Sequence, residues 1–144
     1  MAVHRWMMRG FLIGGILFSP TLVDAGEPEY VSIQTLLSPQ AASYQRRMVT
    51  VQGIANNIEI IPPAPPRPSK QPCLLVYGRA TFTLEDETGS IPVEVLGSCS
   101  PTAMDMLPRE GETVRLTGTV HVLKSDSPRH VIVQAATIQI LDLP

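Results

Sequence analysis

The stretch that decides the fold is Ala80-Thr81-Phe82-Thr83-Leu84-Glu85-Asp86-Glu87-Thr88-Gly89-Ser90-Ile91-Pro92-Val93-Glu94-Val95. Apolar residues take alternate positions on both sides of an acidic turn that ends in Gly89. An alternation with a period of two is typical of strands that bury one face, and a short glycine-containing turn between two such strands predicts a β-hairpin. We expect Phe82 and Leu84 to face the core, opposite Val93 and Ile91 respectively.

The motif F-x-L-x-D-x-T-G-x-I-x-V within this hairpin resembles the central hairpin of OB-fold domains. The segment from Ile33 to Gly53, which ends in V-x-V-x-G, resembles the opening of many bacterial OB domains. The resemblance covers Ile33 to Leu141. It implies an all-β fold: a five-stranded Greek-key barrel with a short helix between the third and fourth strands.

Hydrophobic periodicity places the elements of this barrel. A helical lead-in is expected over Glu27–Tyr44, interrupted at Ser38-Pro39, and a short helix over Ser100–Leu107, with Ser100 as its N-cap and Pro101 in its first turn. Gly53 predicts a bulge or a sharp bend within the first strand. The expected strands are Met48–Ala55, Leu74–Leu84, Ile91–Leu96, Thr113–Leu123 and His130–Leu141.

Residues 61–72 form a proline-rich segment between the first two strands. Its prolines lack the amide donors that strand pairing requires, so an extended, polyproline-like loop is expected. A stiff connector is the favoured interpretation, and the alternatives are a ligand for an aromatic groove or a lid over the OB binding face.

The N-terminal 25 residues have the layout of a secretory signal peptide: a basic start, an apolar run over Phe11–Val23, and Val23-Asp24-Ala25 before Gly26. The apolar run is shorter than the ~20 residues of a membrane-spanning helix. We expect cleavage before Gly26, a periplasmic or secreted protein, and no transmembrane segment in the mature chain. An uncleaved N-terminal anchor is the alternative.

Residues 26–144 are expected to form a single domain. This mature part has nine Lys and Arg against twelve Asp and Glu. A balance of roughly −3 provides no overall attraction for a polyanion, and Arg46-Arg47 is the only adjacent basic pair.

Two cysteines, Cys73 and Cys99, are candidates for a disulfide, because an exported chain meets an oxidising compartment. The hairpin register places Val76 opposite Cys99, so Cys73 lies three residues further along, roughly 10 Å away in regular strands. A disulfide requires Cα atoms within ~7 Å, and a bulge or a break at Gly97 is one way to close the gap. Two buried thiols are the alternative.

The sequence contains none of the common catalytic motifs, which favours a non-enzymatic protein. His121 and His130 lie in neighbouring strands but have no carboxylate at matching spacing, so no metal ligand and no cofactor are predicted. Nor do they match the histidine of exported haem-chaperone OB domains. The acidic cluster Glu85–Glu87 is interpreted as a solvated turn, since it lacks the alternating oxygen ligands of a calcium loop.

The OB resemblance implies a ligand face built mainly on the second and third strands. With Phe82 and Leu84 inward, the outward side chains on these strands are Tyr77, Arg79, Thr81 and Thr83, followed by Pro92, Glu94 and Leu96. Glu94 lies diagonal to Arg79 and is expected to neutralise it. The interpretation favoured for Tyr77 and Arg79 is that they are ordinary outward strand residues.

These features favour an exported OB-fold module that binds an unidentified protein, small ligand or envelope component. The alternative is a module that binds single-stranded nucleic acid, implied by resemblance to anticodon-binding OB domains. Such binders stack bases on exposed aromatic side chains above a basic groove, and this sequence has few of either.

Overall fold

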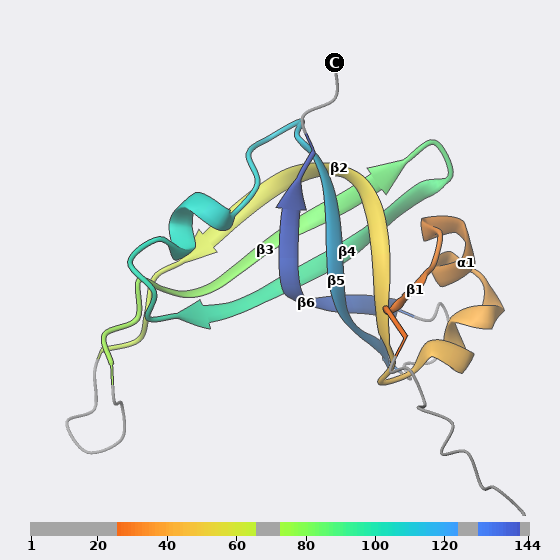
Figure 1. The fold of residues 1–144 in the computed structure, drawn as a ribbon, viewed down its shortest axis with the longest axis horizontal. Coiled ribbons are helices and arrows are strands. Elements are labelled where there is room, and N and C mark those ends of the chain that lie inside the picture. Colours follow the sequence, from red (N-terminus) through yellow and green to blue (C-terminus); the bar gives the residue numbers. More distant parts are fainter. Residues whose placement is uncertain (1–25, 66–72, 124–129, 142–144) are drawn as a thin grey trace, which may run out of the picture.

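The computed structural model describes residues 26–65, 73–123 and 130–141 (Figure 1). The signal-peptide prediction, most of the proline-rich segment and the turn over residues 124–129 lie outside these ranges. No helix within the described ranges is long and apolar enough to cross a membrane. The elements, in chain order, are β1 (Glu29–Tyr30), α1 (Ile33–Leu37), the 3-10 helix η1 (Pro39–Tyr44), β2 (Met48–Ile61), β3 (Tyr77–Asp86), β4 (Gly89–Ser98), the 3-10 helix η2 (Ala103–Met106), β5 (Thr113–Leu123) and β6 (His130–Ile140).

Five of the strands close into a barrel. The first half of β2 pairs with β5 and its second half with β3, both antiparallel. β4 pairs antiparallel with β3 and parallel with β6, and β6 pairs antiparallel with β5. The two-residue β1 adds to β2 in parallel. This confirms the all-β, five-stranded Greek-key barrel expected from the sequence.

β2 serves both sides of the barrel because it bends at Gly53. A Cβ at this position would lie 2.8 Å from the carbonyl oxygen of Glu85 and 2.9 Å from Cγ of Leu84. Only glycine permits such a close approach of two backbones. The bend predicted from Gly53 is therefore confirmed, and pairing changes from β5 to β3 at Ile54.

The register of the β3–β4 hairpin is the predicted one. Leu84 lies opposite Ile91 and Phe82 opposite Val93, and all four side chains are at most 2% exposed. At the turn, one carboxylate oxygen of Asp86 accepts hydrogen bonds from the amide and the hydroxyl of Thr88. The same alternation on the other strands completes one core, which includes Val49, Val51, Val114, Leu116, Val120 and Val133.

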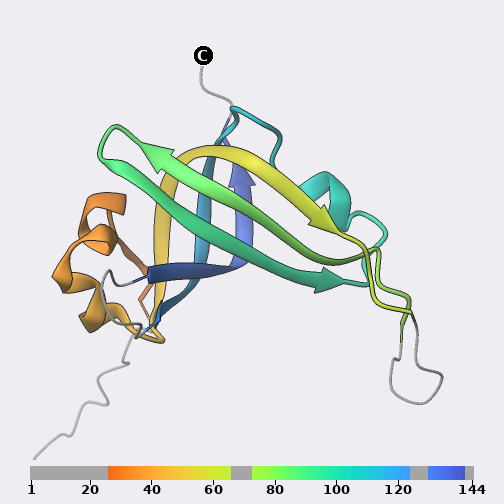
Figure 2. The ribbon, with the colours of Figure 1, turned by 180° about the vertical axis from the view of Figure 1, so that it is seen from behind.

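Helical segments cover the two ends of the barrel (Figures 1 and 2). At one end Ile33 and Leu36 of α1 are fully buried in the main core. At the other end Ala103 of η2 and the following Leu107 pack with Ala80 and Tyr77 in a second, smaller cluster.

Several predicted boundaries were wrong. The lead-in begins as the strand β1, and β2 continues six residues beyond Ala55, because a bulge between Asn56 and Glu59 lets it stay paired with β3. The helix expected from Ser100 is only the four-residue η2. Its N-cap residue is Thr102, without a side-chain cap, and the Ser100 hydroxyl instead shares a hydrogen bond with the Thr102 hydroxyl.

Candidate ligand-binding face

The outer surface of β2, β3 and β4 consists of four cross-strand rows. The rows are Ile61–Arg79–Leu96, Glu59–Thr81–Glu94, Asn56–Thr83–Pro92 and Ile54–Glu85–Ser90. We call these twelve residues the outer face. It contains Arg79, Thr81, Thr83 and Glu94 of the predicted ligand face, each at least partly exposed.

Sequence reasoning missed the contribution of β2 to this face. The strand was expected to end at Ala55, so the side chains of Asn56, Glu59 and Ile61 were not assigned to any row. The alternation of apolar residues fails after Ala55 because the bulge shifts the pairing register by one residue, and Asn57 there adopts a left-handed backbone with a φ of 55°. An asparagine pair, Asn56-Asn57, was the available signal, since asparagine tolerates that conformation.

Arg79 and Glu94 form the predicted diagonal ion pair. Nη1 of Arg79 lies 3.9 Å from Oε1 of Glu94, and the two side chains are 51% and 28% exposed. A pair this exposed contributes about 0–1 kcal/mol to folding. Its main effect is local neutralisation: the outer face has one guanidinium against the carboxylates of Glu59, Glu85 and Glu94, a net formal charge of −2.

Tyr77 is not on the outer face, contrary to prediction. The side chain is 3% exposed and packs against Ala80, Ala103 and Leu107. β3 extends past the barrel at this point, and the segment after Cys99 folds back over it as η2, which a reading of strand alternation alone does not anticipate. The outer face therefore has no aromatic side chain.

Hydrogen bonds order the middle of the outer face. The Thr83 hydroxyl donates to the Asn56 carbonyl oxygen at 3.1 Å and accepts from Nδ2 of Asn57 at 3.1 Å. Nδ2 of Asn56 donates to the Glu85 carboxylate. These bonds hold β2 to β3 across the bulge, so the rows present a preorganised surface.

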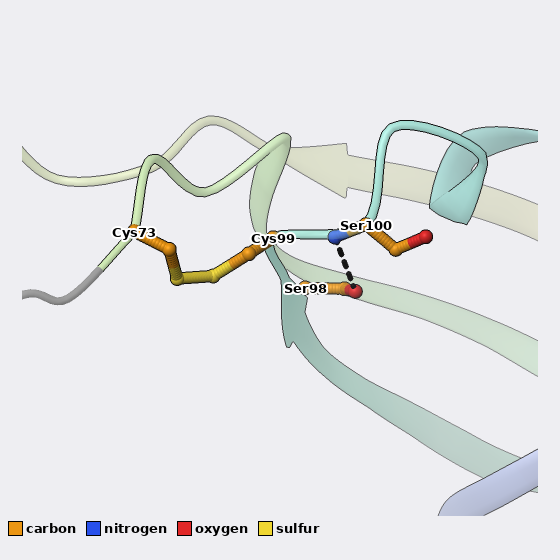
Figure 3. Close-up of a disulfide and its surroundings, with 4 residues drawn as sticks. All are labelled: Cys73, Ser98, Cys99 and Ser100. Atoms are coloured by element: carbon orange, nitrogen blue, oxygen red, sulfur yellow. Dashed lines mark hydrogen bonds between the residues drawn. A yellow bond between two sulfur atoms is a disulfide. The ribbon is translucent and has the colours of Figure 1, made fainter.

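A disulfide joins Cys73 and Cys99, with Cα atoms 5.9 Å apart (Figure 3). The predicted gap is closed before β3 rather than at Gly97, which remains in regular β4. Residues 73–76 leave the strand direction, while the Val76 amide still donates to the Ser98 carbonyl oxygen. Immediately after Cys99, the Ser100 amide donates to the Ser98 hydroxyl, so the bridge anchors the start of the segment that leads to η2.

The two histidines are not brought face to face. His121 lies opposite Ile132, and His130 lies opposite Leu123. Within the described ranges no three His, Cys, Asp or Glu side chains are placed to hold a metal ion.

The acidic turn borders a cleft of about 600 Å³, which Tyr30 and Ile54 also line. Tyr30 comes from β1, within the segment predicted to be helical, so its position beside Glu85–Glu87 was not predicted. Its side chain is 61% exposed.

No protein-family model matches the chain, and no curated protein matches its sequence. Solved structures are similar in fold. A putative aspartyl-tRNA synthetase from Leishmania major Friedlin has a TM-score of 0.52 at 11% identity, over 85% of this chain and 23% of that one. Aspartyl-tRNA synthetase from Entamoeba histolytica has a TM-score of 0.55 at 12% identity, over 81% of this chain and 22% of that one.

A third similar structure is the OBody AM3L09 bound to hen egg-white lysozyme, with a TM-score of 0.52 at 15% identity. It is matched over 81% of this chain and 98% of its own length. By contrast, this chain spans less than a quarter of the two synthetases. At such identities the likeness concerns the fold alone, and that fold is an OB-fold barrel.

Proposed function

We propose that the protein is an exported, non-enzymatic binding module whose outer face takes a protein ligand. Export is supported by the signal-peptide pattern in residues 1–25. A binding role is supported by the OB-fold, in which the outer surface of these strands is the usual ligand platform.

The composition of the outer face favours a protein over a nucleic acid as the ligand. The four rows contain three carboxylates and one guanidinium, which is ion-paired, and no exposed aromatic ring. Affinity for a nucleic-acid strand depends on cations that neutralise phosphates and on rings that stack with bases. Threonine hydroxyls flanked by Ile61, Pro92 and Leu96 instead suit the mixed polar and apolar surface of a polypeptide. The lysozyme-bound OBody illustrates that a domain of this fold can engage a protein.

The second candidate function, binding of single-stranded nucleic acid, rests on the similarity to the two aspartyl-tRNA synthetases. The net negative charge of the outer face weighs against it. Titration of the mature protein with a fluorescent oligothymidylate, at low and at physiological salt, distinguishes the two. We expect no saturable binding; affinity that falls steeply with salt would favour the nucleic-acid function.

Site-specific photocrosslinking tests the protein ligand directly. A photoreactive phenylalanine analogue replaces Thr81, in the second row, or Gln139, an exposed residue of β6 on another side of the barrel. In cells that export the protein, we expect a discrete protein adduct from position 81 that disappears in the Arg79→Glu background. Equal adducts from both positions, or none from position 81, would contradict the proposal.

A further inference from the structure

A second cleft lies away from the outer face, between η2, β4 and the second half of β6. Its volume is about 190 Å³. It exists because β6 leaves β4: the two strands pair only at Val93–Val133 and Glu94–Gln134. Ala136 is the extra residue where the β5–β6 register shifts, and beyond it β6 follows β5 alone. η2 covers the space between the diverging strands but does not fill it.

The lining of this cleft is uncharged. Its apolar wall includes Val95, Ala103, Leu107 and Ile138, and Tyr77 contributes its aromatic side chain. An apolar cavity of ~150 Å³ is large enough to accept benzene. The volume and the lining therefore fit a neutral molecule of about the size of a substituted benzene ring.

The Tyr77 hydroxyl supplies a directional contact. No hydrogen bond joins it to a residue within ranges 26–65, 73–123 and 130–141, and no fully buried side-chain oxygen or nitrogen there lacks a partner. The hydroxyl therefore reaches accessible space, although the residue is 3% exposed. The phenol is protonated at neutral pH and can donate a hydrogen bond, and burial raises the pKa of Tyr77 further.

We propose that the cleft under η2 is a binding site for a small, neutral aromatic molecule that carries a hydrogen-bond acceptor, with the Tyr77 hydroxyl as donor to that acceptor. The site is independent of the protein ligand of the outer face, because Tyr77 and η2 contribute no side chain to the four rows.

Two probes of similar shape test the proposal: acetophenone, which has a carbonyl acceptor, and ethylbenzene, which has none. Binding to the mature, disulfide-bonded protein is followed by amide chemical shifts in NMR spectra. We expect saturable shifts at Ala103, Leu107 and residues 135–138 with both probes, and about five-fold tighter binding of acetophenone, the worth of one hydrogen bond. The absence of saturable shifts at these residues would overturn the proposal.

Two variants define the site. Tyr77→Phe should abolish the five-fold preference and leave the affinity for ethylbenzene unchanged; a preference that persists would exclude Tyr77 as the donor. Ala136→Leu fills the cleft from an exposed strand position and should abolish binding of both probes. The matched control is Ala42→Leu, an exposed alanine of η1 at the other end of the barrel, which should change neither affinity. If Tyr77→Phe does not fold, the comparison of Ala136→Leu with Ala42→Leu tests the site without it. Equal affinity of these two variants for the probes would contradict the site.

Discussion

Arg79 and Glu94 lie on neighbouring strands of the outer face, with Nη1 and Oε1 3.9 Å apart. The cross-strand partner of Arg79 is Leu96 and that of Glu94 is Thr81, so the ion pair runs diagonally between two rows. This diagonal pair neutralises the only cation of the outer face.

Replacing Arg79 by glutamate should weaken protein binding without unfolding the barrel. The side chain is half exposed, so its loss removes no core packing, and repulsion from Glu94 in water should cost less than about 1 kcal/mol. Thermal unfolding and the photocrosslinking yield at position 81 measure the two effects. The charge-matched control is Arg115→Glu, on an exposed position of β5, which should leave the crosslink intact.

Replacing Phe82 by alanine should have the opposite consequence. The ring is 2% exposed, and its removal should lower the free energy of unfolding by about 3–5 kcal/mol, out of the ~5–15 kcal/mol that a domain of this size has. Chemical denaturation provides the measurement. A melting temperature lowered more by Arg79→Glu than by Phe82→Ala would contradict the assigned faces.

Reduction of the disulfide should destabilise the protein. The bridge closes a loop with a sequence separation of 26 residues, for which the chain-entropy relation predicts about 3.5 kcal/mol. We expect a lower melting temperature in reductant and no titratable thiol in the unfolded, unreduced protein. Two thiols per chain under those conditions would show that the cysteines are unpaired.

Gly53→Ala should destabilise the barrel by about 1–3 kcal/mol, as overpacking does. The new Cβ would meet the Glu85 carbonyl oxygen at 2.8 Å, and a backbone atom in a paired strand has no room to retreat. Gly26→Ala is the control, because no atom lies within 4 Å of its Cβ position. Equal stability of the two variants in urea would show that β2 and β3 are less closely packed than described.

Alkaline pH should destabilise the fold partly through Tyr77. Because burial raises the pKa of Tyr77 in the folded state above its ordinary value of about 10, the folded protein holds this proton to higher pH than the unfolded chain. The stabilisation that results is fully present below the pKa of Tyr77 in the unfolded chain. It is lost as pH rises from about 10 toward the higher pKa of the folded state. Tyr77→Phe should therefore flatten the decline of stability in that range. A decline of unchanged slope would assign it to other groups.

The mature protein should begin at Gly26. Val23-Asp24-Ala25 follows the apolar run at the position of a signal-peptidase site. The intact mass of exported protein measures this directly, and a mass that includes Met1 would indicate a retained N-terminal anchor instead.

Local alternation of side chains determined much of this protein from sequence alone. The inward positions of Phe82, Leu84, Ile91 and Val93 follow from a period of two, and the register follows from the turn that ends in Gly89; both are confirmed. The bend at Gly53 is equally local, because it depends on the absence of a side chain. Such features need no knowledge of which distant segments meet.

The composition of the candidate sites was decided by tertiary structure. A bulge after Asn56 carries β2 onward beside β3 and adds Glu59 and Ile61 to the outer face. The chain after Cys99 folds over the end of β3 and buries Tyr77, a side chain that strand alternation had placed outside. Whether an outward side chain meets solvent depends on which remote segment covers it, and that contact is specified by packing of the whole chain rather than by local periodicity.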